Sequence, residues 1–107
     1  MAIVYFLKAN NAVKIGHTVN LEKRLIKLQT GNHNKLEVLL TIPMPDSKQA
    51  HTLEQHFHRW FRVYNIRKEW FRYSNLMQRV IKAINEDGLH CVAQSLEVSH
   101  RFFTADG

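Results

Sequence analysis

Cysteine is almost absent from this chain. Cys91 is the only one among 107 residues, which excludes an intrachain disulfide and a zinc site built from several cysteines. We therefore expect a reducing, intracellular (cytoplasmic) location. The chain also lacks internal repeats, low-complexity tracts and linkers, and its length fits one small domain with a modest core.

Long apolar runs and acidic residues are scarce as well. Lys8 and the pair Asn10-Asn11 interrupt the N-terminal apolar run well short of the roughly 20 residues that a membrane span needs. No small-residue cleavage site follows it, so we expect a soluble protein with no membrane contact. With 15 Lys and Arg against 9 Asp and Glu, the formal net charge is +6. Such an excess attracts polyanions, so nucleic acid is the first partner to consider, and a basic but functionally neutral surface is the alternative.

The N-terminal third has the pattern of a β-hairpin followed by a helix. Residues 2–7 and 12–15 are apolar and rich in β-branched side chains, and the two asparagines between them are a turn signal. Asn20 is a good N-cap, and leucines then recur at helical spacing, which predicts a helix over 20–30. Gly31 suits the left-handed position that often ends a helix.

The middle of the chain predicts one more strand and two more helices. Residues 36–42 are a strand candidate, which Pro43 should end because proline lacks a backbone donor. An apolar stripe at helical spacing predicts a helix over 47–61, capped by Asp46 or Ser47. A further helix should begin at Asn75 and end at Asp87-Gly88, and residues beyond it show no clean period.

Several residues have the chemistry of a phosphate-handling site. Arg24 sits at the edge of the apolar stripe of its helix, and Glu54 has a similar place in the next helix, where a carboxylate can hold a hard divalent cation. Tyr5 and Lys14 lie on the two arms of the hairpin, where an ammonium group would lower the pKa of the phenol. Taken singly, each residue is better explained by an ordinary structural role.

Together, these segments resemble the GIY-YIG endonuclease superfamily. Ile3-Val4-Tyr5 stands in the place of the first motif and Val13-Lys14-Ile15-Gly16 in that of the second. Asn20 to Leu25 is similar to the helix that supplies the family arginine, and Leu53 to Phe57 contains the position of the family glutamate. Lys68-Glu69-Trp70-Phe71 resembles the end of the compact, phage-type branch. The order and spacing of the motifs are specific, whereas any one of them is weak.

The resemblance implies a fold and an activity. The implied fold is α+β, a single domain with a small three-stranded antiparallel sheet flanked by helices, which we place at residues 1–87, with a C-terminal extension at 88–107. The implied activity is metal-dependent hydrolysis of nucleic-acid phosphodiesters, DNA before RNA. Oligomeric state is open, and a homodimer is one way for so small a nuclease to cut both strands.

The resemblance also assigns roles by position. Tyr5, with Lys14 beside it, would activate the attacking water, and Arg24 would bind the scissile phosphate. Glu54 would hold one Mg²⁺ or Mn²⁺, and His17 would touch phosphate or assist proton transfer. Lys14 replaces the tyrosine of the second motif. That departure is the main support for the alternative function, a non-catalytic nucleic-acid-binding module with the same fold.

Basic residues interleave with aromatic ones after the second long helix. This mixture suits a single-stranded or distorted strand, whose bases stack while the charges track the phosphates. We expect Trp60 and Phe71 to be core and Tyr64 to be the exposed stacking residue. The predicted nucleic-acid contacts are Lys23, Lys27, Arg59, Arg62, Tyr64, Asn65, Arg67 and Arg72.

Seven histidines in so short a chain suggest a second metal-binding hypothesis. His51, Glu54 and His58 share one side of the predicted helix, so two imidazoles and a carboxylate could converge on a transition metal. From the first to the last of them the helix rises by roughly 10 Å, which is long for one ion. A histidine-based metal-binding protein is therefore a third and weaker interpretation.

Overall fold

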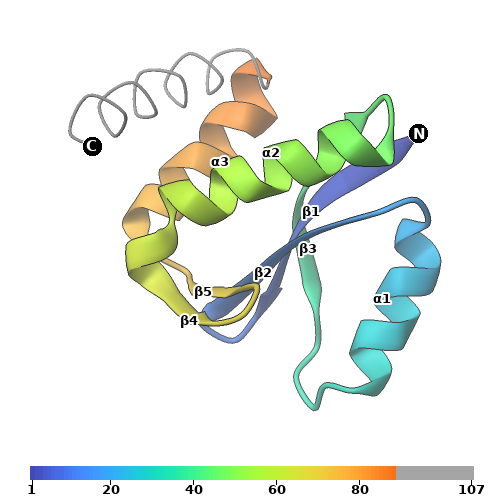
Figure 1. Ribbon diagram of the computed structural model, residues 1–107. Helices are drawn as coiled ribbons and strands as arrows, with labels where there is room; N and C mark the ends of the chain where they lie inside the picture. The colour runs from blue at the N-terminus through green and yellow to red at the C-terminus, as the bar shows by residue number, and fades with distance from the viewer. Residues whose placement is uncertain (89–107) are drawn as a thin grey trace. The chain divides into compact units, whose positions relative to one another are not determined.

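The computed structural model describes residues 1–88. Contacts divide the chain into two compact units, Met1–Tyr73 and a second one that begins at Ser74. The elements of the first unit are β1 (Ala2–Ala9), β2 (Ala12–Thr18), α1 (Leu21–Thr30), β3 (Glu37–Met44), α2 (Ser47–Trp60), the 3-10 turn η1 (Arg62–Tyr64), β4 (Asn65–Arg67) and β5 (Trp70–Arg72) (Figure 1). The second unit contains α3 (Asn75–Asp87).

β1 and β2 form the predicted hairpin. A two-residue turn joins them, and Asn10 in that turn takes a left-handed conformation with φ of 57°, which asparagine tolerates better than most residues. The register places Tyr5 opposite Gly16 and Leu7 opposite Lys14. Since side chains alternate between the two faces of a strand, Tyr5, Leu7, Lys14 and Gly16 share one face.

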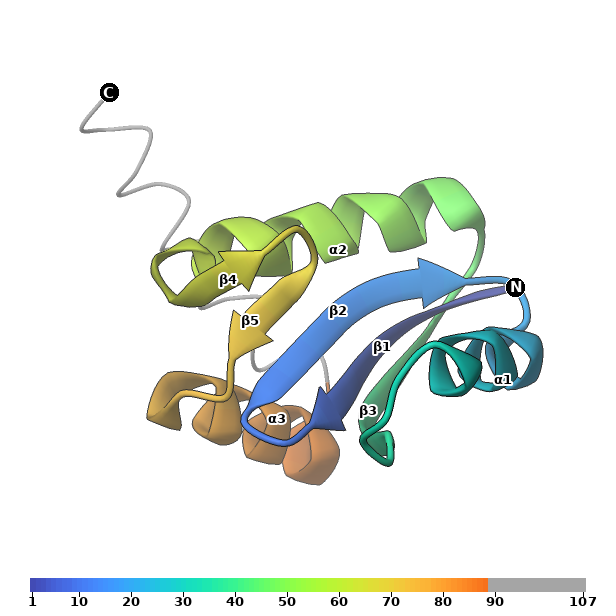
Figure 2. The same ribbon diagram turned by 90° about the horizontal axis from the view of Figure 1, so that it is seen from below.

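The sheet has five strands, so the prediction of a three-stranded sheet is wrong, although the α+β class agrees. The strand order is β3-β1-β2-β5-β4, and every pairing is antiparallel (Figure 2). β4 and β5 have three residues each, too few to show the alternation by which a strand is recognised in sequence. They extend the sheet beyond β2, where they form one side of the candidate site.

The ends of β3 and α1 also differ from the predictions. β3 continues through Pro43, which is paired with Ile3, because β3 is an edge strand and an edge tolerates a residue without a backbone donor. Gly31 follows α1 with φ of −91°, not in the left-handed region. The Asn20 cap is confirmed: its side chain accepts a hydrogen bond from the Lys23 backbone N–H.

α2 covers the face of the sheet opposite Tyr5. The Phe6 ring meets the Phe57 ring edge-on with centroids 5.0 Å apart, and the Phe61 ring with centroids 6.5 Å apart. Each buried phenylalanine contributes about 1.5–3 kcal/mol of hydrophobic stabilisation. The Asp46 side chain caps α2 by accepting from the Gln49 backbone N–H. This packing fixes which side chains of α2 point towards β2.

α1 and α3 have different burial. No residue of α1 is buried, and the helix lies beyond the carboxyl end of β2 (Figures 1 and 2). In the second unit, α3 has Ser74 as its N-cap. Its buried residues lie on one apolar face and are Met77, Val80, Ile81 and Ile84.

The helices in the part of the chain that the structure describes are all too short or too polar to span a membrane. The proposed domain boundary at residue 87 stays a prediction, and the extension lies mostly outside the described residues.

Candidate active site

The Tyr5 ring lies directly over Gly16. A Cβ atom added to Gly16 would stand 2.5 Å from the Tyr5 hydroxyl oxygen and 2.6 Å from its Cζ atom. No side chain larger than hydrogen fits there, since a glycine within a strand marks a place of close approach. Gly16 therefore provides the space that the Tyr5 ring occupies, and Tyr5 is 1% exposed.

The environment of Tyr5 holds its hydroxyl group in the protonated form. Burial raises its pKa above the ordinary value of 10.0. The charge of Arg24 and a side-chain hydrogen bond with Arg24 act in the opposite direction, and the charges of Glu69 and Glu54 raise the pKa further. Lys14 is not among the groups that shift this pKa, and the net shift is upward, so the expected lowering of the Tyr5 pKa by Lys14 is wrong. Arg24 and Glu54 therefore both lie within electrostatic range of Tyr5.

This pKa has a measurable effect on stability. Above about pH 10 the unfolded chain loses a Tyr5 proton that the native protein keeps, so the free energy of unfolding falls as pH rises towards the raised native pKa. We expect Tyr5→Phe to remove that part of the loss. Denaturant unfolding of both proteins between about pH 9 and pH 11 measures it, with Tyr64→Phe as control. Identical pH profiles for wild type and Tyr5→Phe would contradict the assignment.

Glu54 lies at the centre of a cluster of two histidines. Its side chain faces the sheet from α2 and the residue is 3% exposed. Glu54 Oε2 is 3.3 Å from His17 Nδ1 on β2 and 3.5 Å from His51 Nδ1 on α2. The three ligand atoms lie within 4.8 Å of one another. A carboxylate and two imidazoles at this spacing are a donor set that can hold one divalent metal ion.

The cluster also has an unsatisfied buried atom. His17 Nδ1 is buried and, within residues 1–88, has no hydrogen-bond partner despite its closeness to the Glu54 carboxylate. An unpaired buried nitrogen costs about 1–3 kcal/mol. A cation between the three donor atoms would remove that cost, so the residues present fit the divalent metal that the resemblance implies.

His58 does not belong to this cluster. Its Nε2 atom lies 2.8 Å from the Ile15 carbonyl oxygen, to which it donates a hydrogen bond, and its ring packs on Phe71. The trio of His51, Glu54 and His58 is therefore wrong in its third member. β5 pairs with β2 only as far as Lys14, so His58 instead satisfies a carbonyl group on the open part of β2.

Lys14 forms an ion pair with Glu69. Lys14 Nζ is 3.1 Å from Glu69 Oε2 and 5.7 Å from the centre of the Trp70 ring. The backbone supports this arrangement, because the Ile15 N–H donates to the Glu69 carbonyl oxygen over 3.1 Å. Lys14 therefore contributes its charge on the Tyr5 face of the sheet while being held by the segment before β5.

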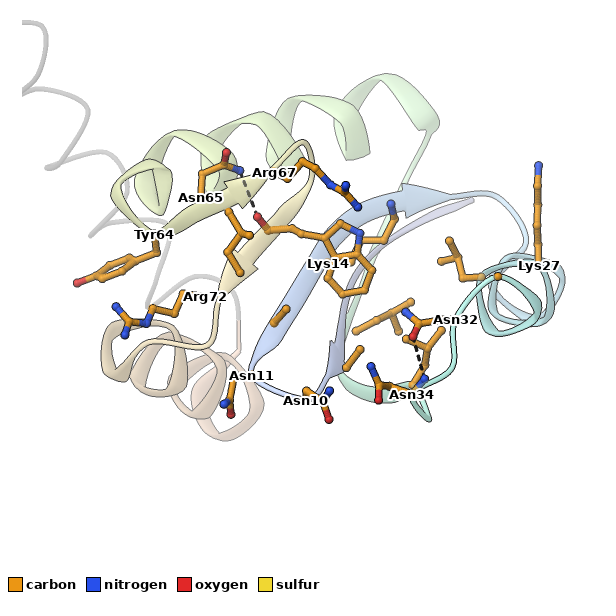
Figure 3. A pocket seen from close by; sticks show the side chains of 18 of the residues that line it. Asn10, Asn11, Lys14, Lys27, Asn32, Asn34, Tyr64, Asn65, Arg67 and Arg72 are labelled. Atoms are coloured by element: carbon orange, nitrogen blue, oxygen red, sulfur yellow. Dashed lines mark hydrogen bonds between the residues drawn. The ribbon is translucent and has the colours of Figure 1, made fainter.

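A hollow of about 1160 Å³ lies on the Tyr5 face of the sheet. It receives five of the predicted nucleic-acid contacts: Lys27, Tyr64, Asn65, Arg67 and Arg72 (Figure 3). Lys23, Arg59 and Arg62 do not line it. The Asn65 amide is engaged locally, since its Nδ2 donates to the Lys68 and Trp70 carbonyl oxygens, so it shapes the wall. Trp60, expected in the core, is only half-buried, whereas Phe71 is buried.

Sequence reasoning grouped His51 and Glu54 correctly but chose His58 as the third ligand, because the third donor, His17, comes from a different element. It used Glu69 only as part of a motif and missed its ion pair with Lys14. Its position directly before Trp70 could have indicated this pair. Trp70 of β5 is paired with Lys14 of β2, so Glu69, the residue before Trp70, lies close to the Lys14 side chain.

Comparison with known proteins identifies a family. The chain matches the T5orf172 domain over residues 2–88. No curated protein and no solved structure shows significant similarity to it. T5orf172 is a phage-associated domain of the GIY-YIG and nuclease-like superfamily, and its members are nuclease-related. Since the match covers most of the chain, including the hairpin, Arg24 and the histidine and glutamate cluster, this protein belongs to the T5orf172 domain family.

Proposed function

We propose that this protein is a divalent-metal-dependent endonuclease that hydrolyses DNA phosphodiester bonds. The observation that carries the proposal is the convergence of His17, His51 and Glu54 on one point, with Glu54 and Arg24 each in electrostatic range of Tyr5. A metal ligand set, a phosphate-binding cation and a neutral phenol are the groups that such a hydrolysis needs.

The proposed role of each side chain follows from its charge. The exposed Arg24 guanidinium binds the non-bridging oxygens of the scissile phosphate and offsets the negative charge that grows there. Tyr5 stays protonated, so it donates its hydrogen bond to a phosphate oxygen or orients the attacking water and does not act as a preformed base. The water oxygen forms the new bond to phosphorus as the ester P–O bond breaks. One proton of that water is released to solvent, and the leaving oxygen takes a proton from solvent, so the products are a phosphate monoester and a free hydroxyl group.

The metal ion would be held by Glu54, His17 and His51. A divalent ion there would supply Lewis acidity next to the scissile phosphate. Two of the three donors are imidazole nitrogens, which Mg²⁺ accepts reluctantly and Mn²⁺ accepts more readily. Of the two ions expected from the resemblance, we therefore propose Mn²⁺ as the better activator.

A cleavage assay tests the proposal directly. Purified protein is incubated with single-stranded and duplex DNA and RNA in Mn²⁺, in Mg²⁺ and in EDTA. We expect DNA cleavage that is faster in Mn²⁺ and absent in EDTA. If DNA stays intact under every metal condition, the protein is not the nuclease proposed here. Cleavage that continues in EDTA would contradict the metal-dependent mechanism.

His51 allows the ligand set to be tested. Its side chain is 60% exposed, so His51→Ala should leave the fold intact. We expect Mn²⁺ binding to weaken at least about tenfold, with a smaller change for Mg²⁺ because Mg²⁺ prefers oxygen ligands. Isothermal titration calorimetry measures both. His33→Ala, an exposed histidine of the loop between α1 and β3, is the control, and equal affinities in the two variants would remove His51 from the site.

A further inference from the structure

The hollow on the Tyr5 face is a groove between two walls. Its floor is the β1–β2 hairpin, with Leu7, Ala9, Ala12 and Lys14. One wall is the end of α1 and the loop that follows it, and the other is the segment from η1 through β5 (Figure 3). The Gln29 side chain braces the first wall by donating to the Asn32 and Asn34 carbonyl oxygens and accepting from the Leu36 N–H.

The groove is positive and rich in amides. Lys14, Lys27, Arg67 and Arg72 line it, and among its lining residues, all of them described by the structure, none is acidic. Asn10, Asn11, Asn32 and Asn34 add side-chain amides around the rim (Figure 3). Lys14 is ion-paired with Glu69 just outside the lining, so Lys27, Arg67 and Arg72 carry the excess positive charge. This charge favours a polyanion, and amides can hydrogen-bond to base edges, so the lining is complementary to nucleic acid.

The groove also offers aromatic and apolar surface to unpaired bases. Trp70 and Tyr64 are half-buried in its wall, and Val63 and Ile66 beside them are 76% and 59% exposed. The alanines of the floor leave space above the sheet. In a duplex each base is already stacked and paired, so its face cannot reach a ring inside a hollow, whereas a single strand presents its bases freely.

The groove lies on the same face of the sheet as Tyr5. The pair of Leu7 and Lys14 in its floor is the next pair along the same face of the hairpin from Tyr5 and Gly16. A strand whose phosphate rests on Arg24 and Tyr5 can therefore extend over Lys14 towards Trp70. We infer that the groove binds single-stranded DNA next to the scissile phosphate, so that the substrate is single-stranded or locally unpaired DNA; this rests on the proposed function.

Binding without metal separates this inference from catalysis. In EDTA, fluorescence anisotropy compares a labelled single-stranded oligonucleotide with a duplex and an RNA of the same length. We expect the single-stranded DNA to bind at least about tenfold tighter than the duplex. Equal or tighter binding of the duplex, or tighter binding of RNA, overturns the inference. A protein that binds in this way but cleaves nothing refutes the proposed nuclease and leaves the groove standing.

Variants locate the contact. We expect Trp70→Ala to weaken single-strand binding roughly fivefold to a hundredfold. Trp70→Phe keeps an aromatic ring and should weaken binding less, which distinguishes the loss of stacking from a general loss of folding. Arg67→Ala should lower the slope of log affinity against log salt by about 0.7, the loss of one phosphate contact. Arg79→Ala, outside the groove, is the control.

Tryptophan fluorescence tests stacking on Trp70 directly. In a Trp60→Phe background Trp70 is the only tryptophan. Unchanged fluorescence emission of Trp70 on binding of the oligonucleotide would rule out stacking on its ring.

Discussion

A Glu54→Gln protein is expected to fold normally and to lose about a hundredfold to a thousandfold of its DNA cleavage rate, the scale of removing one preorganised charged group. Glutamine keeps the volume of the side chain in its buried place between α2 and β2. It removes the negative charge that a cation needs beside two neutral imidazole ligands. Metal affinity should fall together with the rate, because Glu54 Oε2 is the atom that both histidines face.

The measurements are cleavage in Mn²⁺, calorimetry of Mn²⁺ binding, and circular dichroism to establish the fold. Glu22→Gln is the matched control, since it makes the same change at an exposed glutamate of α1. DNA binding in EDTA should stay close to wild type, because Glu54 contributes no favourable contact to a polyanion. Undiminished cleavage by purified Glu54→Gln would refute the metal site and the nuclease proposal with it.

Gly16→Ala is expected to have the second large effect, although it adds a single methyl group. The new Cβ atom would stand 2.5 Å from the Tyr5 hydroxyl oxygen, so the ring must move. Overpacking of this kind costs about 1–3 kcal/mol, and a domain of 60–100 residues loses roughly 4–8 °C of melting temperature per kcal/mol. Since the displaced phenol also leaves Arg24, cleavage should fall about a hundredfold, the lower scale of losing one preorganised donor.

Gly31→Ala is the control for this prediction. It makes the same chemical change where the nearest atom to a new Cβ, the Leu28 carbonyl oxygen, is 3.9 Å away, an ordinary contact. Gly31 also has a negative φ, so its stability should change little. Thermal melts of the two variants make the comparison, and the cleavage rate of Gly16→Ala is compared with that of wild type, because Gly31 lines the groove. If Gly16→Ala melts and cleaves like wild type, Tyr5 is not seated on Gly16 as described.

The parts of the fold that could be predicted are those with long, regular patterns. The hairpin, α1 and α2 follow from turn asparagines, caps and apolar spacing, and their observed bounds lie close to the expected ones. β4 and β5 could not be predicted, because three residues do not establish a period. Pro43 misled for a related reason: its effect depends on whether the strand lies at an edge, which is a property of the whole sheet.

Most residues of the candidate site could be identified from the sequence, but their pairing in space could not. Glu54 was placed at the rim of the apolar face, and the structure buries it among the residues that face the sheet. Its pairing with His17 joins two elements, so no spacing along α2 could reveal it. The register of Tyr5 follows once the turn is known to hold only two residues, since Tyr5 must then face Gly16 and Lys14 must face Leu7.

The short pairing of β5 with β2 has a consequence for how such a protein can change. Only Ala12, Val13 and Lys14 of β2 pair with β5, and the groove wall formed by β4 and β5 joins the sheet through this short seam. The histidine and glutamate cluster lies elsewhere, on β2 and α2. Exchanging the β4–β5 hairpin for another sequence would therefore alter which ligand the proposed groove accepts while leaving the candidate metal ligands untouched, so that recognition and chemistry can evolve, or be engineered, independently.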